Sequence, residues 1–337
     1  MSRRKVMFVT SSGAAWPVNR QMPGSASVWG DTDYFIDTDP GIFPDWLVVF
    51  SGWTDLEFVT EVPYERRILV CGEPEGFHRY QPKFLGQFGH VITSQSIVKH
   101  PGVIASYPAT PWFAGIRYLG PNGPFAADLK FADFVAGNPP KSKLCSVVCS
   151  HKAMTKGHRQ RLAFVERLQQ EFGAQIDFFG RDSRGISDKD EALADYRYHI
   201  ALENSSYPNY WTEKLADPFL RGCFPIYSGC PNIADFFPRD SYVSIDLSRQ
   251  PEAIVTIKAV LQGNLDREHA AALAESKRRI LWEYNVFAML ERLYPRLEAA
   301  SPGVGKGGIA TLLLTDHDFK QQRVDRRFKR YLRGLFA

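Results

Sequence analysis

The sequence contains few cysteines. Its 337 residues include five, an odd number, and their spacing does not match a zinc-binding pattern. A chain of this length does not need a disulfide framework to fold. We therefore expect free thiols, as in a reducing cytoplasm, at Cys71, Cys145, Cys149, Cys223 and Cys230.

Long hydrophobic runs are also missing. Basic residues at the start precede a short apolar run, Val6 to Val9, which is shorter than the core of a secretion signal or a membrane span. We interpret this run as a first β-strand and expect a cytoplasmic protein. The sequence also lacks a Walker glycine loop, a serine nucleophile elbow and an H-x-x-x-H pair, which argues against P-loop nucleotide hydrolysis, serine-hydrolase chemistry and histidine-based metal sites.

Net positive charge is confined to one segment. The chain has a net charge of +4, but residues 319–337 hold seven basic side chains and one acidic side chain, so the remainder sums to −2. A nearly neutral body argues against nucleic-acid binding. Apolar residues recur at helical spacing within the basic segment, which predicts an amphipathic helical tail. The tail could pack on the body of the protein, or it could hold the protein on the anionic inner face of a membrane, which is the interpretation that we favour.

The order of elements predicts an α/β protein with two domains. Short apolar runs alternate with loops and helices, as in layered α/β proteins, and the length suits two domains of about 150 residues. We expect two Rossmann-like domains facing a cleft, with a boundary in the turn-rich stretch near residue 140. Residues 1–140 are predicted to form an acceptor-side domain, and residues 141–300 a nucleotide-sugar-binding domain. Residues 301–337 are predicted to form a flexible linker with the basic tail.

The most informative segment spans residues 196–246. A buried strand delivers Glu203, Asn204 and Ser205 to its carboxyl end, where ligands bind in α/β sheets. A turn then leads to Thr212, a good helix N-cap, and the helix that follows begins with Glu213 and Lys214. Free backbone N–H groups at such a helix end suit a diphosphate, and Lys214 would add a mobile cation. An ordinary capped helix would show the same Thr-Glu-Lys triplet, and only its position after Glu-Asn-Ser favours a site.

This segment resembles the signature region of the family-ten α-1,3/1,4-fucosyltransferases. Three pieces match in order, namely Leu202–Ser205, Tyr210–Lys214 and Pro225–Gly229, with Leu202 where the family usually has Phe. The resemblance covers about 50 continuous residues and implies a GT-B fold, a GDP-fucose donor, a glycan acceptor and inverting chemistry without a metal or other cofactor. It also implies that Asn204 and Tyr210 contact the donor, and that Lys214 binds its diphosphate.

The resemblance extends more weakly upstream. The loop after the strand at residues 176–180 implies a phosphate-binding arginine, for which Arg181 and Arg184 are both candidates, because a guanidinium binds phosphate bidentately. Arg159 or Arg161, on the preceding helix, are further alternatives. A solvated loop arginine is the ordinary interpretation of any of the four that does not bind phosphate.

The catalytic groups of the implied mechanism are two carboxylates. Glu73 follows a predicted strand and Gly72, and it resembles the base that removes the acceptor proton; Glu75 is the alternative. Glu213 would stabilise positive charge on the sugar during the displacement. In the first half, the resemblance is confined to this strand-then-Glu element.

Three rival interpretations remain open. Two D-x-D triplets, at residues 31–33 and 37–39, could hold a divalent ion as in metal-dependent glycosyltransferases. The same fold could use a different GDP-sugar, since the named residues suit phosphate better than they suit the sugar. A non-catalytic relative that binds sugar nucleotides or glycans is the third, and donor hydrolysis without acceptor would separate it from an enzyme.

Overall fold

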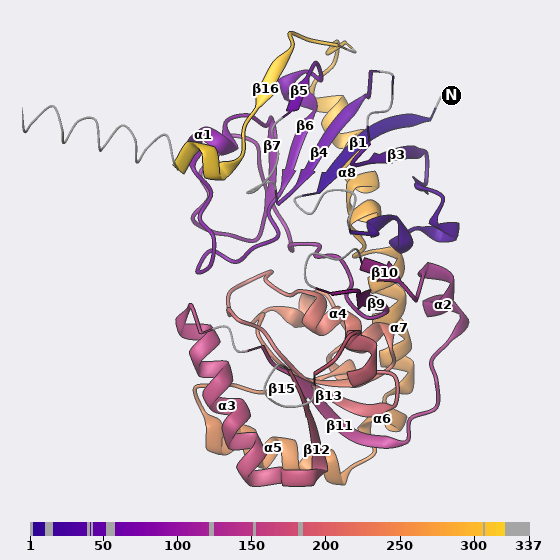
Figure 1. Cartoon of the computed structure of the whole chain (residues 1–337), viewed down its shortest axis with the longest axis vertical. Coiled ribbons are helices and arrows are strands. Elements are labelled where there is room, and N and C mark those ends of the chain that lie inside the picture. The colour runs from indigo at the N-terminus through magenta and orange to yellow at the C-terminus, as the bar shows by residue number, and fades with distance from the viewer. Residues whose placement is uncertain are drawn as a thin grey trace, which may run out of the picture. The chain divides into compact units, whose positions relative to one another are not determined.

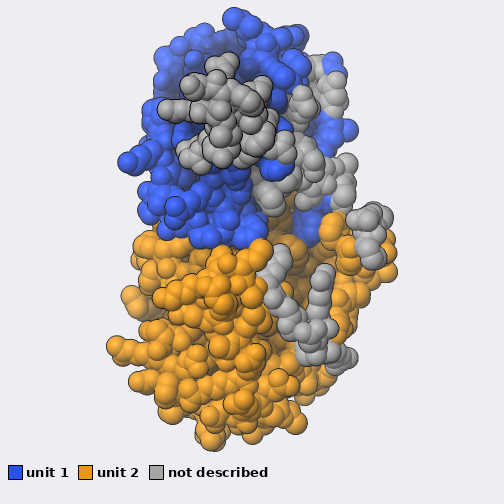
Figure 2. All heavy atoms as spheres, turned by 60° about the vertical axis from the view of Figure 1, so that its left-hand side comes forward, with its two compact units in different colours: residues 1–16, 27–106, 293–337 blue, residues 17–26, 107–292 orange. Residues whose placement is uncertain are grey.

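The chain forms two compact units, which are described separately (Figure 2). Unit 1 comprises residues 1–16, 27–106 and 293–337, and unit 2 comprises residues 17–26 and 107–292. The computed structural model describes residues 3–10, 16–38, 41, 43–51, 58–120, 125–150, 153–180, 185–305 and 307–320.

These bounds differ from the predicted boundary near residue 140. Residues 17–26 belong to unit 2 because Arg20 is buried there and its guanidinium donates hydrogen bonds to the carbonyl oxygens of Trp112 and Leu129, at 2.6 and 2.7 Å. These contacts join segments about 100 residues apart, so local composition could not reveal them. The turn-rich stretch that predicted a linker leads from α2 (Phe131–Ala136) into the central sheet of unit 2.

Unit 1 is built on a seven-stranded sheet in the order β2-β3-β1-β4-β6-β7-β8 (Figure 1). All neighbours are parallel except β2 and β3. Every residue of β4 and β6 is buried, as expected of central parallel strands. The strands are β1 (Arg4–Thr10), β2 (Val28–Trp29), β3 (Thr32–Ile36), β4 (Trp46–Phe50), β6 (Arg67–Val70), β7 (His90–Thr93) and β8 (Val103–Ala105).

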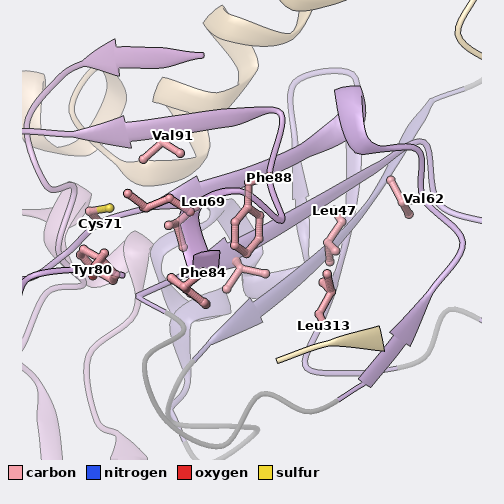
Figure 3. Close-up of a cluster of buried hydrophobic side chains, with 11 residues drawn as sticks. Leu47, Val62, Leu69, Cys71, Tyr80, Phe84, Phe88, Val91 and Leu313 are labelled. Atoms are coloured by element: carbon pink, nitrogen blue, oxygen red, sulfur yellow. The ribbon is translucent and has the colours of Figure 1, made fainter. Parts of the chain in front are cut away.

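The C-terminal segment packs into the core of unit 1. Strand β16 (Thr311–Leu313) pairs antiparallel with β5 (Phe58–Thr60), and Leu313 is fully buried among side chains that include Leu47, Leu69 and Phe88 (Figure 3). Phe319 packs against the same cluster. The predicted flexible linker is therefore wrong for residues 311–320, because apolar residues anchor them. Residues 321–337, which hold most of the predicted amphipathic tail, lie outside the described residues.

Unit 2 is built on a five-stranded parallel sheet in the order β12-β11-β13-β14-β15. The middle strand, β13, is buried along almost its whole length, as its apolar run Ile200–Leu202 predicts. Beside this sheet lies the two-stranded pair β9 (Ile116–Tyr118) and β10 (Phe125–Ala127). The sheet strands are β11 (Lys143–Val148), β12 (Ile176–Phe179), β13 (Tyr196–Leu202), β14 (Phe224–Ser228) and β15 (Val243–Ser244).

Helices α3 to α7 belong to unit 2. The continuous helix expected over Arg267–Leu293 is interrupted, because Asn285 caps a new helix by accepting a hydrogen bond from the Phe287 N–H at 3.1 Å. Asn285 is itself buried and donates to the Gln21 carbonyl oxygen at 2.6 Å. The helices are α3 (Lys156–Phe172), α4 (Glu213–Leu220), α5 (Gln250–Gln262), α6 (Leu265–Glu268), α7 (Ala270–Trp282) and α8 (Val286–Ala300), besides the short α1 (Pro82–Leu85) of unit 1.

Candidate functional site

Glu203 lies immediately beyond the carboxyl end of β13, and its side chain is completely buried. Its carboxylate accepts hydrogen bonds from the backbone N–H of Thr212 at 2.8 Å and from the Thr212 hydroxyl at 2.9 Å. A Cβ on Gly229 would come within 2.5 Å of Glu203 Cγ, so only glycine fits there. The three matching pieces of the signature segment therefore meet at Glu203.

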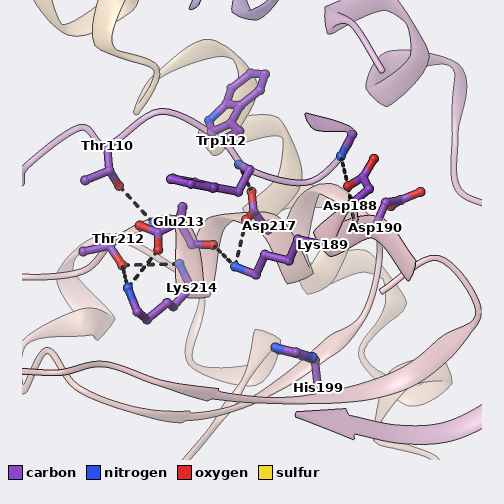
Figure 4. Close-up of polar contacts among 12 residues, drawn as sticks. Thr110, Trp112, Asp188, Lys189, Asp190, His199, Thr212, Glu213, Lys214 and Asp217 are labelled. Atoms are coloured by element: carbon purple, nitrogen blue, oxygen red, sulfur yellow. Dashed lines mark hydrogen bonds and ion pairs between the residues drawn. The ribbon is translucent and has the colours of Figure 1, made fainter. Parts of the chain in front are cut away.

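Helix α4 begins as predicted, but its first N–H groups are occupied. Thr212 is the N-cap and accepts a hydrogen bond from the Lys214 N–H, while the Glu213 N–H donates to the Thr110 hydroxyl at 2.9 Å (Figure 4). The expectation of free N–H groups for a diphosphate is therefore wrong at these two positions. The cationic side chains near this helix start are therefore better candidates for binding an anion than these two N–H groups.

Lys214 and Glu213 form an ion pair at 2.8 Å, and their side chains are 24% and 15% exposed. Burial would raise the pKa of Glu213, but the ammonium groups of Lys214 and Lys189 lower it to about 2. Burial would lower the pKa of Lys214, but the carboxylates of Glu213 and Glu203 raise it. Both side chains are therefore charged at neutral pH.

Glu203 behaves differently from Glu213. Its Oε2 atom lies 3.9 Å from the Lys214 ammonium nitrogen, beyond hydrogen-bond distance. Burial raises the pKa of Glu203 to about 7, against the opposing effect of the Lys214 charge. Glu203 can thus exchange a proton near neutral pH, whereas Glu213 stays ionised.

Asn204 and Tyr210 lie together beside this cluster. The Tyr210 hydroxyl donates a hydrogen bond to the Asn204 side-chain oxygen at 2.9 Å. The Tyr210 ring is buried and stacks on Tyr207, with ring centroids 4.8 Å apart. Tyr210 thus orients the Asn204 amide.

Lys189 and Asp217 support α4, and the sequence analysis missed both. The Lys189 ammonium group donates to Asp217 Oδ2 at 2.8 Å and to the Glu213 carbonyl oxygen at 3.2 Å (Figure 4). Asp217 is fully buried and also accepts a hydrogen bond from the Phe113 N–H. An aspartate on the apolar face of a short helix, as in Leu-Ala-Asp-Pro-Phe, was the available signal, because a buried carboxylate needs a partner.

Arg161 is a third residue whose placement the sequence did not reveal, although it was one of the candidate arginines. It is 4% exposed and lies on α3, where its Nη2 atom donates to the Ser150 hydroxyl at 3.2 Å. Its Nε atom is buried and has no hydrogen-bond partner among the described residues. The guanidinium lies close enough to Lys214 to oppose the raised pKa of that ammonium. Arg161 is thus a buried cation beside the Lys214 cluster.

Gly157 explains why Arg161 faces this cluster. A Cβ at Gly157 would come within 2.1 Å of the Asn204 carbonyl oxygen, so the first turn of α3 touches the turn after β13. Arg161 is four residues further along and therefore projects from the same face of α3. Arg159, by contrast, is exposed. Arg181 and Arg184 lie outside the described residues.

In unit 1, Glu73 follows β6 as predicted. Its backbone carbonyl accepts a hydrogen bond from the Gln95 side-chain nitrogen at 2.7 Å, and its side chain is partly exposed. Glu75 accepts a hydrogen bond from the Ser96 hydroxyl at 3.4 Å. A Cβ at Gly72 would lie 2.8 Å from the Ser51 hydroxyl, so the chain needs glycine before Glu73. Glu73 thus lies at the carboxyl edge of a parallel sheet, where functional side chains are usual.

Two aspartates of the D-x-D triplets, Asp33 and Asp37, have protein partners. Asp33, on β3, pairs with Arg3 at 2.5 Å, and Asp37 accepts hydrogen bonds from the backbone N–H and hydroxyl of Thr10. Burial raises the pKa of Asp37. Asp39 lies outside the described residues. Within the described part of the chain, no three His, Cys, Asp or Glu side chains are grouped so as to hold a metal ion.

None of the described helices combines the length and the apolar character needed to cross a membrane. All five cysteines are free and buried, as expected. Burial raises the pKa of Cys230 to about 11, so its thiol is protonated and unreactive at neutral pH.

The fold and the site define a class. Two units, each on a mainly parallel α/β sheet, confirm the predicted α/β architecture, and unit 2 holds a buried cluster of cations and carboxylates at the carboxyl end of its middle strand. Residues 138–268 match the family described as glycosyltransferase family 10 (fucosyltransferase), C-terminal part. This part of the chain is therefore similar to glycosyltransferase family 10.

Curated relatives align over short stretches. The chain is 39% identical over 64 residues to alpha-(1,3)-fucosyltransferase B of Drosophila melanogaster, which is 19% of this chain and 14% of that protein. It is 33% identical over 108 residues to a putative fucosyltransferase-like protein of Arabidopsis thaliana, 31% of this chain and 21% of that protein. The match to alpha-(1,3)-fucosyltransferase FucT of Helicobacter pylori is 35% over 74 residues, 22% of this chain and 16% of that protein. The aligned stretches thus span less than a quarter of each of these relatives.

Among solved structures, this chain is similar to a crystal structure of α1,3-fucosyltransferase. The match covers 91% of this chain and 92% of the fucosyltransferase chain, with a TM-score of 0.49 and 18% sequence identity.

Proposed function

We propose that this protein is an inverting glycosyltransferase that transfers L-fucose from GDP-fucose to a hydroxyl group of a glycan, without a metal ion. The observation that carries the proposal is the pair of cations, Lys214 and Arg161, beside the first turn of α4 in a family-10 segment. Two cationic side chains can do for a diphosphate what a divalent ion does in metal-dependent transferases.

Arg161 joins Arg181 and Arg184, which lie outside the described residues, as a proposed phosphate ligand. Among the described residues the buried Nε of Arg161 has no hydrogen-bond partner, which is costly unless a ligand, water or another part of the chain completes its hydrogen bonds. A phosphate group supplies acceptors of suitable charge and geometry. Lys214 would contribute a second, mobile contact, since its side chain retains some exposure.

The other catalytic and donor-binding roles are assigned from the charge and the contacts of each side chain. Glu213 stays ionised and can stabilise positive charge on the sugar as the bond to the diphosphate breaks. The Asn204 amide, held by Tyr210, would contact the donor. Glu73 would accept the proton of the acceptor hydroxyl, with Glu75 as the alternative.

The donor experiment tests this proposal. Calorimetry in EDTA should show that the protein binds GDP and GDP-fucose, and that it binds UDP-sugars more weakly. If GDP binds only after Mn²⁺ is added, the proposal is contradicted. Arg161→Ala should raise the Kd of GDP about 10- to 150-fold, which corresponds to about 1.5–3 kcal/mol for a hydrogen bond to a charged group. Arg159→Ala, on the exposed face of the same helix, is the matched control and should bind as the unaltered protein does.

Two alternatives remain distinguishable. If another GDP-sugar binds more tightly and is the one consumed, the donor is not fucose. If GDP-fucose binds but is neither transferred nor hydrolysed, the protein is a non-catalytic binding relative.

Residues 319–337 would in either case hold the protein reversibly on anionic lipid, because each basic side chain near such a surface contributes about 1 kcal/mol.

A further inference from the structure

Asp316 lies in the C-terminal segment that packs into unit 1, and its side chain is completely buried. A buried carboxylate is costly unless cations or hydrogen-bond donors surround it. The His78 Nε2 atom lies 3.1 Å from Asp316 Oδ2, and the Lys320 ammonium nitrogen lies 2.7 Å from the same oxygen. The Gln81 N–H donates to Asp316 Oδ1 at 2.5 Å. Burial would raise the pKa of Asp316, but these three contacts lower it, so the carboxylate is ionised at neutral pH.

Two of these partners belong to the turn that carries the proposed catalytic base, or follow it closely. Glu73 opens this turn. The N–H groups of Phe77 and His78 close it, because both donate to the Pro74 carbonyl oxygen at 2.9 Å. Gln81 comes three residues after the turn. Since the turn is short and internally hydrogen-bonded, a displacement of His78 also displaces Glu73.

The same turn has a second attachment, which acts on its backbone. Gln95 follows β7, and its side-chain nitrogen donates to the carbonyl oxygens of Glu73 and His78 at 2.7 and 3.0 Å. Gln95 thus ties both ends of the turn to the carboxyl edge of the sheet. Asp316 holds the His78 side chain and the backbone beyond it, from a position 235 residues after Gln81.

Apolar packing fixes the C-terminal segment that brings Asp316 to this turn. Leu313 and Tyr80 belong to the same buried cluster (Figure 3). The Tyr80 ring stacks on Phe84 with ring centroids 5.8 Å apart, and the His78 ring meets Tyr80 edge-on at 4.6 Å. A close-packed cluster of this kind resists small displacements. The C-terminal segment therefore gives Asp316 a rigid support.

Stability alone does not explain a carboxylate at this position. An apolar side chain of similar size would fill the same space, and buried ion pairs often contribute little net stability compared with such packing. A carboxylate differs from an apolar side chain because it holds particular donors in fixed directions. The donors held here, on His78 and Gln81, belong to the segment that starts at Glu73.

We propose that Asp316 is a positioning residue for the proposed catalytic base, Glu73. It holds the side chain of His78 and the N–H of Gln81, and thereby fixes the turn from which Glu73 reaches the acceptor hydroxyl. The inference rests on the proposed function, and it applies equally if Glu75, in the same turn, is the base. A base must lie within hydrogen-bond reach of the proton that it removes, so a shift of about 1 Å in this turn costs about 10²-fold in rate.

The experiment compares the turnover of GDP-fucose with its binding. Turnover is measured as GDP release with water as the acceptor and with a panel of free glycans, and binding is measured by calorimetry in EDTA. In Asp316→Asn, one oxygen stands where the carboxylate has two, so the side chain cannot accept hydrogen bonds on both sides. We expect kcat to fall about 10- to 100-fold and the Kd of GDP-fucose to stay within about twofold, because the proposed donor ligands are other residues.

Leu313→Ala is the matched control for stability. It removes an apolar anchor of the same segment and leaves the contacts of Asp316 in place. It should therefore lower the Tm, yet at temperatures well below unfolding its kcat should stay within about twofold of the unaltered value.

A second pair of variants tests the contact between His78 and Asp316 and stays informative if Asp316→Asn fails to fold. The side-chain nitrogen of glutamine can take the place of the His78 Nε2 atom and donate to Asp316. His78→Gln should therefore retain turnover within about threefold. His78→Leu has no donor, and its kcat should fall as in Asp316→Asn.

The outcomes separate this inference from the proposed function. If Asp316→Asn keeps the unaltered kcat, if Leu313→Ala loses as much turnover, or if the two His78 variants lose turnover equally, Asp316 does not position the base although the donor site stands. If Glu73→Gln and Glu75→Gln both retain turnover, the base lies elsewhere and the inference fails, again without effect on donor binding. If the protein does not bind GDP-fucose, or binds it and never consumes it, the proposed function fails and the inference with it.

Discussion

Replacing Lys214 by Met is the most direct test of the cationic cluster. Methionine retains most of the apolar stem and removes only the ammonium group, which donates to Glu213 at 2.8 Å. A phosphate contact of comparable quality contributes about 1.5–3 kcal/mol, so the Kd of GDP should rise about 10- to 150-fold. Calorimetry in EDTA measures this change directly.

The same substitution should also lower stability. Breaking a buried ion pair costs about 3–5 kcal/mol when a charge is left uncompensated. Here Glu203 can become protonated near pH 7, and Lys189 still acts on Glu213, so we expect a loss below that range. Thermal unfolding with and without GDP separates the two effects, because GDP should raise the Tm of the variant less than that of the unaltered protein.

The control is Lys258→Met on the exposed surface of α5. It removes one positive charge from unit 2 without touching the cluster, so it should leave the Kd of GDP within about twofold, as expected for a distant, screened charge. If Lys214→Met also binds GDP within twofold of the unaltered protein, Lys214 does not bind the diphosphate and the interpretation of the cluster is refuted.

Two further predictions concern unit 1 and the tail. Glu73→Gln should reduce transfer by about 10²–10⁴, the usual contribution of a general base, and leave GDP affinity unchanged; Glu75→Gln is its control, and the reverse outcome would make Glu75 the base. Truncation after Lys320 should leave the Tm unchanged and abolish co-sedimentation with anionic vesicles at low salt, whereas truncation after Gly308 should lower the Tm because it removes the buried Leu313. Equal sedimentation of the full-length protein and the form ending at Lys320 would show that residues 321–337 do not bind lipid.

Much of unit 2 could be predicted because its signals are local. The apolar run before Glu203 predicted a buried strand, and Thr212 predicted a helix start, since both depend on residues within one or two turns. The order of the three signature pieces predicted the family, and residues 138–268 match it. The position of the Thr-Glu-Lys triplet after the strand that ends in Glu-Asn-Ser also identified Lys214 and Glu213 as candidates.

Contacts between segments that are far apart in the chain could not be predicted from the sequence. The Glu213 N–H donates a hydrogen bond to the hydroxyl of Thr110, which lies 103 positions earlier in the chain. This N–H is therefore not free to bind an anion, contrary to the prediction. Arg161 could not be separated from Arg159 by pattern, because only the approach of α3 to Asn204 shows which one is buried. A charge is informative about a site only when its burial and its neighbours are known.

The C-terminal segment shows the same division. Its composition, glycine-rich and then basic, determined the prediction of a flexible linker with an amphipathic tail. The tertiary structure decided that residues 311–320 belong to the core of unit 1, because β16 finds its hydrogen-bond partner in β5 and Leu313 packs beside Leu47. Sequence patterns report what a segment can do alone, whereas burial against a strand 250 residues earlier depends on where the whole chain places that strand.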